Sequence, residues 1–200
     1  MARNTDPFEW SGNHTALDFV NTLDERPSDA PVENCATYAD LVRFAELAGL
    51  IESSLSKRLQ LLKAASCARI ARRARALREH LFAVLAAAHQ GKPAPAASLE
   101  AISMEVRQAH AARTLAATQP STAMAYRWRS PSSQKLPLYS CALAVEALLV
   151  GPELRRIRKC GASDCDVYFL DTSKANRRQW CQMSNCGNRE KQRRRRKITR

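Results

Sequence analysis

The sequence lacks any run of about 18 consecutive apolar residues, the length that a membrane-spanning helix requires. Residues 142–150 form an apolar run that is too short and that contains Glu146. The first residues carry Asp6 and Glu9 and no apolar run after Arg3, unlike a secretory signal. We therefore expect a soluble protein of the reducing cytoplasm, with no membrane partner.

Histidine is also scarce, and the recognisable catalytic motifs are missing. The four histidines fall in no known pattern, and neither a Gly-rich phosphate loop nor a His-Glu-x-x-His motif is present. His80 and His89 are nine residues apart on an expected helix, so they do not share a face closely enough to hold a metal. The sequence therefore favours a protein that is not an enzyme.

Negative charge is sparse at one end of the chain only. The formal net charge is +13 for 200 residues. Residues 155–200 hold 15 Lys or Arg against 4 Asp or Glu, whereas residues 1–154 are almost balanced. Because a local cluster of cations gains free energy by releasing counterions from phosphates, this asymmetry indicates a polyanionic partner. Nucleic acid is favoured over an anionic membrane.

The first three quarters of the sequence read as helical. Thr37 is a suitable N-cap for a helix that ends at Gly49. Between residues 53 and 89, apolar residues recur every three or four positions, which predicts one long helix or two. Ser98 can cap a further helix, and residues 138–158 are expected to be helical on both sides of a break near Pro152.

Two shorter segments of this region are less regular. Residues 11–26 read as extended chain or one turn, and residues 126–129 alternate aromatic with basic side chains, as a short strand does. The expected fold class is mainly α. We predict an α-helical domain with a short β element at residues 1–152 and a small module at residues 153–200.

Seven cysteines are present, and an odd number in a reducing compartment does not suit a disulfide framework. Four of them form two pairs with equal spacing, Cys160 with Cys165 and Cys181 with Cys186, and fifteen residues separate the pairs. Four thiolates in tetrahedral array favour one zinc ion, and they close its coordination sphere, so the zinc is expected to be structural. An iron–sulfur cluster and unrelated buried thiols are the alternatives. The remaining Cys35, Cys67 and Cys141 suit buried, reduced thiols.

The expected zinc module has a β-hairpin and a basic helix. Residues 167–170 are the one β-favouring run between the pairs, so we place a strand there and expect the intervening segment to form a hairpin. A basic helix is expected to follow Cys186 and to extend to Lys197. About 45 residues bury too little apolar area to fold alone, so the metal is effectively the core.

Particular motifs resemble known families. The string Cys186-Gly187-Asn188-Arg189, with the Cys160-x4-Cys165 pair and residues 169–173, resembles the CGNR zinc finger family over about residues 153–197. Residues 16–22 and 38–41 resemble the ABATE domain, which usually precedes that finger. The resemblance implies a stress-linked bacterial transcriptional regulator. It implies that the finger binds DNA and that the N-terminal domain senses a ligand.

The main hypothesis is therefore a zinc-dependent DNA-binding regulator. The residues expected to contact nucleic acid, with duplex DNA as the favoured form, are the cations of the module: Lys174, Arg177, Arg178, Arg189, Lys191, Arg193, Arg194, Arg195, Arg196 and Lys197. Asn188 is either a base contact or a helix cap, and Trp180 either stacks on a base or packs over the hairpin. RNA binding, protein interaction and a solvated basic tail are the alternatives.

A second hypothesis gives the N-terminal domain a small-molecule effector. Its candidate contacts are the polar residues of one short segment, namely His14, Asp18, Asn21 and Thr22. The alternative is that these side chains cap helix ends or satisfy buried backbone groups. A homodimer is compatible with such a regulator.

Overall fold

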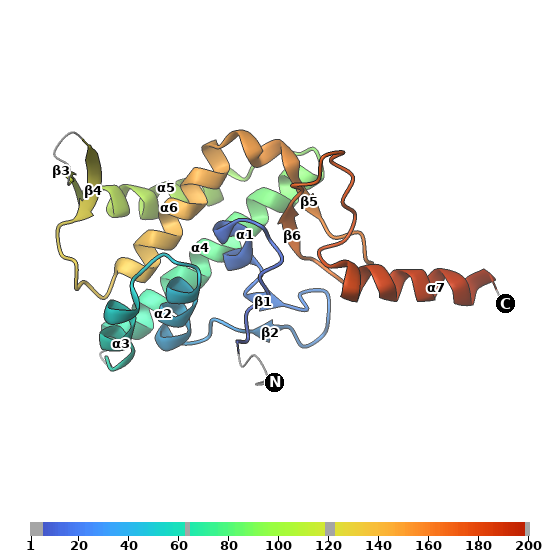
Figure 1. Ribbon diagram of the computed structural model, residues 1–200, viewed down its shortest axis with the longest axis horizontal. Helices are drawn as coiled ribbons and strands as arrows, with labels where there is room; N and C mark the ends of the chain where they lie inside the picture. Colours follow the sequence, from blue (N-terminus) through green and yellow to red (C-terminus); the bar gives the residue numbers. More distant parts are fainter. Residues whose placement is uncertain (1–5, 63–64, 119–122, 199–200) are drawn as a thin grey trace.

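Figure 1 shows the computed structural model of the protein, which describes residues 6–62, 65–118 and 123–198. The fold is mainly α, as predicted, with short strand pairs at its edges. The helices and turns are α1 (Thr15–Val20), α2 (Tyr38–Leu47), α3 (Ser53–Gln60), α4 (Ala65–His89), α5 (Ala96–Ala111), α6 (Leu136–Val150), η1 (Pro152–Arg156), η2 (Met183–Gly187) and α7 (Asn188–Ile198). The strands are β1 (Leu23–Asp24), β2 (Val32–Glu33), β3 (Arg113–Ala117), β4 (Met124–Trp128), β5 (Ile157–Lys159) and β6 (Tyr168–Leu170).

Helix α2 begins where the sequence predicted. The Thr37 hydroxyl accepts a hydrogen bond from the Asp40 backbone N–H, and the Asp40 carboxylate accepts one from the Thr37 backbone N–H. This capping box satisfies two N–H groups that a helix start leaves without partners. After Ala48, Gly49 has a φ of 69°, which favours glycine and ends the helix.

The periodic region after residue 53 forms two helices, α3 and α4. The predicted apolar stripe of α4 is buried from Ile70 to Leu85, since Ala74, Leu77 and Leu81 also face the core. Helix α6 differs because it is apolar on nearly all sides, and it packs against α1, α2, α4 and α5. A helix that is apolar all round belongs at the centre of a fold, and Figure 1 shows α6 crossing the molecule over α4.

Some expected boundaries were wrong. Ser98 does not cap α5, which begins at Ala96 after Pro95; its hydroxyl lies 3.3 Å from His80 Nδ1. The segment expected to stay helical after Pro152 forms only the short 3₁₀ turn η1 before strand β5 begins at Ile157. Residues 15–20 form a short helix, α1, in keeping with the one-turn alternative.

The strands form three separate antiparallel pairs within the described residues, β1 with β2, β3 with β4, and β5 with β6. Strand β4 was predicted, whereas its partner β3 was not. Strand β6 was also predicted, and its Tyr168 and Leu170 side chains belong to the large helical core. Strand β6 therefore joins the helical part of the chain to the cysteine-rich part.

None of the helices in the described part of the chain is long and apolar enough to cross a membrane. Figure 1 places the β3–β4 hairpin at one end of the long axis and α7 at the other.

Candidate metal centre and basic helix

Cys160, Cys165, Cys181 and Cys186 come together around one point. Their four Sγ atoms all lie within 4.8 Å of one another. The Sγ atoms of Cys165 and Cys181 are 3.8 Å apart, and those of Cys181 and Cys186 are 3.5 Å apart. A zinc ion with four thiolates at about 2.3 Å places the sulfurs about 3.8 Å from each other. The donor set and its dimensions therefore fit zinc.

Charge at the cluster leads to the same conclusion. Hydrogen bonding from the Cys165 thiol lowers the pKa of Cys160 to about 2. The same contact raises the pKa of Cys165 to about 12, and hydrogen bonding to Cys160 raises the pKa of Cys181 as well. Four thiolates this close repel one another unless a cation balances them, and a bound Zn²⁺ supplies that charge. The four cysteines form a zinc-binding site for one structural ion.

The β5–β6 hairpin positions the first cysteine pair. Ile157 pairs with Leu170 and Lys159 with Tyr168, so Cys160 and Cys165 lie in the loop between the two strands. We name this loop, residues 160–165, the zinc knuckle. The predicted position of the hairpin, between the cysteine pairs, was wrong, because strand β5 precedes Cys160. Of the segment expected to form it, residues 166–180, only β6 is regular, and residues 171–180 have no strand or helix.

Asp171 organises that irregular segment, a role that was not predicted. Its buried carboxylate accepts hydrogen bonds from the backbone N–H groups of Ser173 at 2.9 Å and Arg178 at 3.0 Å. Hydrogen bonding from Ser173 lowers the pKa of Asp171. A local signal was present, because an Asp followed by Thr and Ser after a strand is typical of a turn.

Arg178 is half-buried, and its guanidinium donates to backbone carbonyls of the protein. Its Nε donates to the Trp180 carbonyl at 2.9 Å, and its Nη2 donates to the carbonyls of Ser11 and Cys181. The guanidinium also lies 4.2 Å from the centroid of the Phe169 ring. Arg178 therefore links the second cysteine pair to the N-terminal segment, whereas Lys174 and Arg177 of the same loop are exposed.

Trp180 packs between two glycines. A Cβ atom on Gly161 would lie 3.2 Å from Trp180 Cζ3, and one on Gly187 would lie 3.1 Å from Trp180 Cδ1 and closer still to Met183 Sδ. The indole is half-buried against the cysteine cluster. This arrangement favours packing over base stacking for Trp180, and it gives Gly187 a steric reason to be glycine.

Helix α7 is tied to the zinc knuckle at its first two turns. Asp164 accepts hydrogen bonds from Arg189 Nη2 at 2.9 Å and Arg193 Nη2 at 2.7 Å, one at each carboxylate oxygen. Arg189 Nη2 also lies 3.3 Å from Cys186 Sγ. The Arg193 guanidinium lowers the pKa of Asp164. The first cations of the helix therefore fix its direction relative to the metal.

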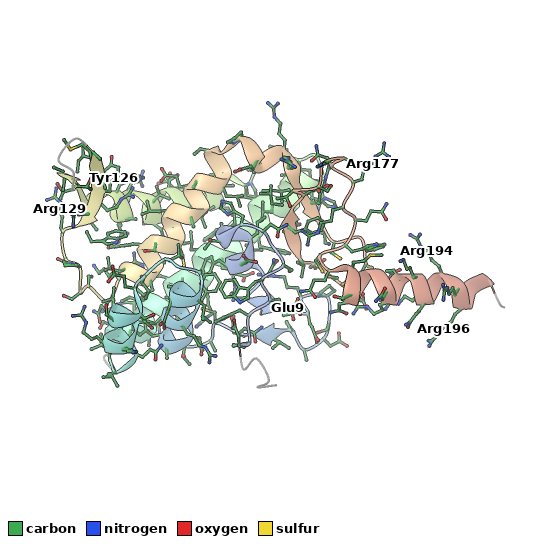
Figure 2. All side chains as sticks on the ribbon, viewed as in Figure 1. Glu9, Tyr126, Arg129, Arg177, Arg194 and Arg196 are labelled. Atoms are coloured by element: carbon green, nitrogen blue, oxygen red, sulfur yellow. The ribbon has the colours of Figure 1, made fainter. Side chains whose placement is uncertain are left out.

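The other predicted cations of α7 have a different position. Lys191, Arg194, Arg195 and Arg196 are exposed on the helix, and Figure 2 shows Arg194 and Arg196 projecting to opposite sides of it. The side chain of Lys197 lies outside the described residues. Asn188 is the first residue of α7, and its Nδ2 donates to the Ser184 carbonyl at 3.2 Å.

The four residues predicted to contact an effector are largely hydrogen-bonded within the protein. His14 Nδ1 accepts from the Ala16 N–H, and Asp18 Oδ1 accepts from the Gly12 N–H at 2.8 Å. Asn21 pairs with the backbone of Tyr168 in both directions, at 2.9 Å and 3.1 Å. Thr22 Oγ1 donates to the Phe19 carbonyl.

Burial shifts the pKa values of two of these groups, because it disfavours their charged forms. It raises the pKa of Asp18 to about 6, and it lowers the pKa of His14. The predicted buried thiols Cys35, Cys67 and Cys141 are indeed free and buried. Burial raises the pKa of Cys35 to about 12, so this thiol is unreactive.

A cavity of about 490 Å³ separates the β1–β2 region from the zinc knuckle. Asn21 is the one predicted effector contact among its lining residues. On the finger side, the lining includes Asp164 and Arg189. The cavity therefore adjoins the contact that fixes α7.

A closed four-cysteine site between a β-hairpin and a basic helix defines a zinc-finger protein. The model of the CGNR zinc finger family matches residues 156–197. The model of the ABATE family, described as "Putative stress-induced transcription regulator", matches residues 13–152. Since that match covers more than half of the sequence, the chain belongs to the ABATE family. A comparison with curated proteins found no match.

Proposed function

We propose that this protein is a zinc-dependent transcriptional regulator that binds duplex DNA through its finger, in the cytoplasm and without catalysis. The observation that carries the proposal is α7, a helix with eight charged side chains of which one, Glu190, is acidic. Its first turns are fixed to the zinc knuckle through Asp164, and its later cations are exposed as far as Arg196. Both family descriptions, a transcription regulator and a zinc finger, agree with this role.

The predicted contacts fall into two groups. Arg178, Arg189 and Arg193 hold the finger together through hydrogen bonds to carbonyl or carboxylate oxygens. We assign the direct phosphate contacts to the exposed cations Lys174, Arg177, Lys191, Arg194, Arg195 and Arg196, and to Lys197 beyond them. An exposed cation can approach phosphate and release counterions, whereas Arg189 and Arg193 already pair with a carboxylate and gain less.

The decisive experiment measures zinc content and duplex binding together. The purified protein is titrated on a labelled duplex at several salt concentrations, beside Cys181→Ser and the double variant Arg194→Gln with Arg196→Gln. We expect one zinc per chain, and the slope of log affinity against log salt should fall by roughly 0.9 for each phosphate contact removed. A matched control is Lys57→Gln with Arg58→Gln on α3. It removes two exposed cations that are distant from α7 in the sequence, and it should leave binding unchanged.

Loss of binding in Cys181→Ser together with a weakened Arg194 and Arg196 variant supports the proposal. Zinc binding without duplex binding would contradict it and would favour RNA or a protein as the partner of the finger. A duplex affinity that is unchanged by the two Arg substitutions would show that α7 is not part of the interface.

We also propose that the N-terminal domain receives an effector and that residues 1–152 and 153–200 act as two domains. The cavity beside Asn21 supports the effector, because a ligand there would contact both the β1–β2 region and the zinc knuckle. Among the proposed effector contacts, His14, Asp18 and Thr22 serve mainly the local fold.

A homodimer stays part of the proposal, and sedimentation analysis of the free protein and its DNA complex tests it.

A further inference from the structure

The β3–β4 hairpin projects from the end of the molecule opposite to α7 (Figure 1). Its strands pair from Arg113 with Trp128 to Ala117 with Met124. The base of the hairpin is anchored, because Trp128 stacks on Tyr139 of α6 with ring centroids 6.3 Å apart. The Arg129 backbone N–H donates to the Ala112 carbonyl at 2.9 Å. The hairpin is therefore a fixed projection of the helical domain.

One face of this hairpin exposes large apolar side chains. Leu115 lies opposite Tyr126 in the register, and Met124 is two residues away on the same face. Leu115 is 61% exposed, Tyr126 is 60% exposed and Met124 is 62% exposed. Neighbouring exposed apolar side chains are typical of a surface that binds a partner.

The charge of the same region indicates what kind of partner it binds. Residues 106–145 contain no Asp or Glu, and their five cations are Arg107, Arg113, Arg127, Arg129 and Lys135. Arg127 and Arg129 are exposed, and Figure 2 shows Arg129 and Tyr126 together at this end of the molecule. The Arg113 guanidinium lies 4.4 Å from the Tyr126 ring centroid and holds the ring in place.

A second copy of the chain is a poor occupant, because it would bring these arginines against each other. A polyanion suits them. Since side chains alternate along a strand, Arg127 lies on the opposite face of the hairpin from Tyr126, so the hairpin presents cations on one face and apolar side chains on the other. The major groove of DNA is wide enough to admit a two-stranded β-ribbon. Duplex DNA therefore fits both the charge and the shape of the hairpin.

We propose that the β3–β4 hairpin is a second contact with duplex DNA. The hairpin enters the groove between its two walls: Arg127 and Arg129 bind phosphates on one side, and Tyr126, with Leu115 and Met124, packs against the other. The inference rests on the proposed function for its partner, but it adds a surface outside the zinc finger. Because the hairpin and α7 lie at opposite ends of the molecule, they contact separate segments of DNA (Figure 1).

The test compares variants of the two surfaces in the full-length, zinc-loaded protein. Binding to a duplex of roughly 40 base pairs, about 136 Å long, is measured against salt for Arg127→Gln with Arg129→Gln and for Tyr126→Ala. We expect the double variant to lose affinity by about tenfold and its salt slope to fall by roughly 1.8. Tyr126→Ala should lose about fivefold or more with its slope unchanged, since stacking and packing are not ionic.

Two conservative variants guard against a misfolded hairpin. Arg127→Lys with Arg129→Lys should keep the slope, and Tyr126→Phe should keep the affinity. The α3 pair Lys57→Gln with Arg58→Gln removes the same charge elsewhere and should change nothing.

The outcomes separate the two proposals. Wild-type affinity in both hairpin variants, beside weakened Arg194 and Arg196 variants, overturns the hairpin contact alone. If the hairpin variants lose duplex affinity and the α7 variant does not, the hairpin contact is supported and the role of α7 is overturned. Absence of duplex binding in the wild type overturns both, and equal losses in the α3 control would overturn the hairpin site in favour of a general charge effect.

Discussion

The two buried clusters of the protein are stabilised in different ways. The large cluster draws apolar side chains from α1 to α6 and from β6. The small cluster contains Cys160, Ala162, Val167, Phe169, Cys181 and Cys186, with Cys165 and Trp180 packed against it. Half of its buried members are zinc ligands, so the small cluster depends on a metal where the large one depends on apolar burial. A single chain thus holds two regions that owe their stability to different interactions.

Loss of the metal should have the largest effect, and it should be confined to the small cluster. Structural zinc contributes on the order of 10–16 kcal/mol of apparent binding free energy. We expect Cys181→Ser or chelation to abolish amide-exchange protection in residues 160–167 and 179–187, while α4 and α6 keep theirs. Hydrogen exchange followed by mass spectrometry measures this. Equal loss of protection in α4 would contradict the comparison.

A cavity in the large cluster should have the opposite pattern. Leu81 is fully buried on α4, and Leu81→Ala is expected to lower the free energy of unfolding by about 2–5 kcal/mol. The variant should still bind one zinc per chain, since Leu81 is not part of the small cluster. Urea unfolding and metal analysis measure the two quantities. The control is Leu61→Ala, because Leu61 is 80% exposed and should contribute little.

The contact between the two clusters, which we call the seam, includes the hydrogen bonds between Asn21 and β6. Its side chain imitates a peptide group and satisfies both the N–H and the carbonyl of Tyr168. Asn21→Ala leaves these buried groups without partners, so we expect a loss of about 2–4 kcal/mol in the free energy of unfolding. Urea unfolding measures this loss. Zinc should be retained, but exchange protection at β6 should fall.

Asn13 offers a control, because it also binds the backbone of β6. Its Nδ2 donates to the Leu170 carbonyl at 3.1 Å, but Asn13 is exposed and has a φ of 56°. Asn13→Gly keeps that backbone conformation and should cost under about 1 kcal/mol. An Asn21 variant no less stable than this control would mean that the seam carries little energy.

Features determined by nearby residues could be predicted from the sequence. The N-cap at Thr37 and the apolar stripe of α4 are local patterns, and the structure confirms both. The four cysteines that come together could also be predicted, because two closely spaced cysteine pairs are typical of one tetrahedral zinc site. Strand β3 had no comparable signal, since Arg113 to Ala117 contains only one β-branched residue, Thr114.

Features determined by distant residues could not be predicted. Arg178 looks like one more cation in a basic loop, but the carbonyl of Ser11, far away in the sequence, occupies its Nη2. Arg78 lies on the buried face of α4, where Glu33 accepts two hydrogen bonds from its guanidinium at 2.6 Å each. A sequence shows that a side chain is cationic, and only the fold shows whether its donors are already occupied.

The smallest effect concerns Asp18, which lies beside the seam. Its pKa is raised to about 6 by burial, above the usual value near 3.9 in an unfolded chain. The folded state then holds a proton that the unfolded state releases between about pH 4 and pH 6, so ionisation of Asp18 lowers stability as the pH rises through this window. Asp18→Asn keeps an acceptor for the Gly12 N–H at 2.8 Å and removes the charge. After allowance for solvent screening, we expect the variant to gain about 1 kcal/mol at pH 7 and nothing near pH 4. Urea unfolding at both values measures this, and an equal gain at pH 4 would point to packing in place of charge.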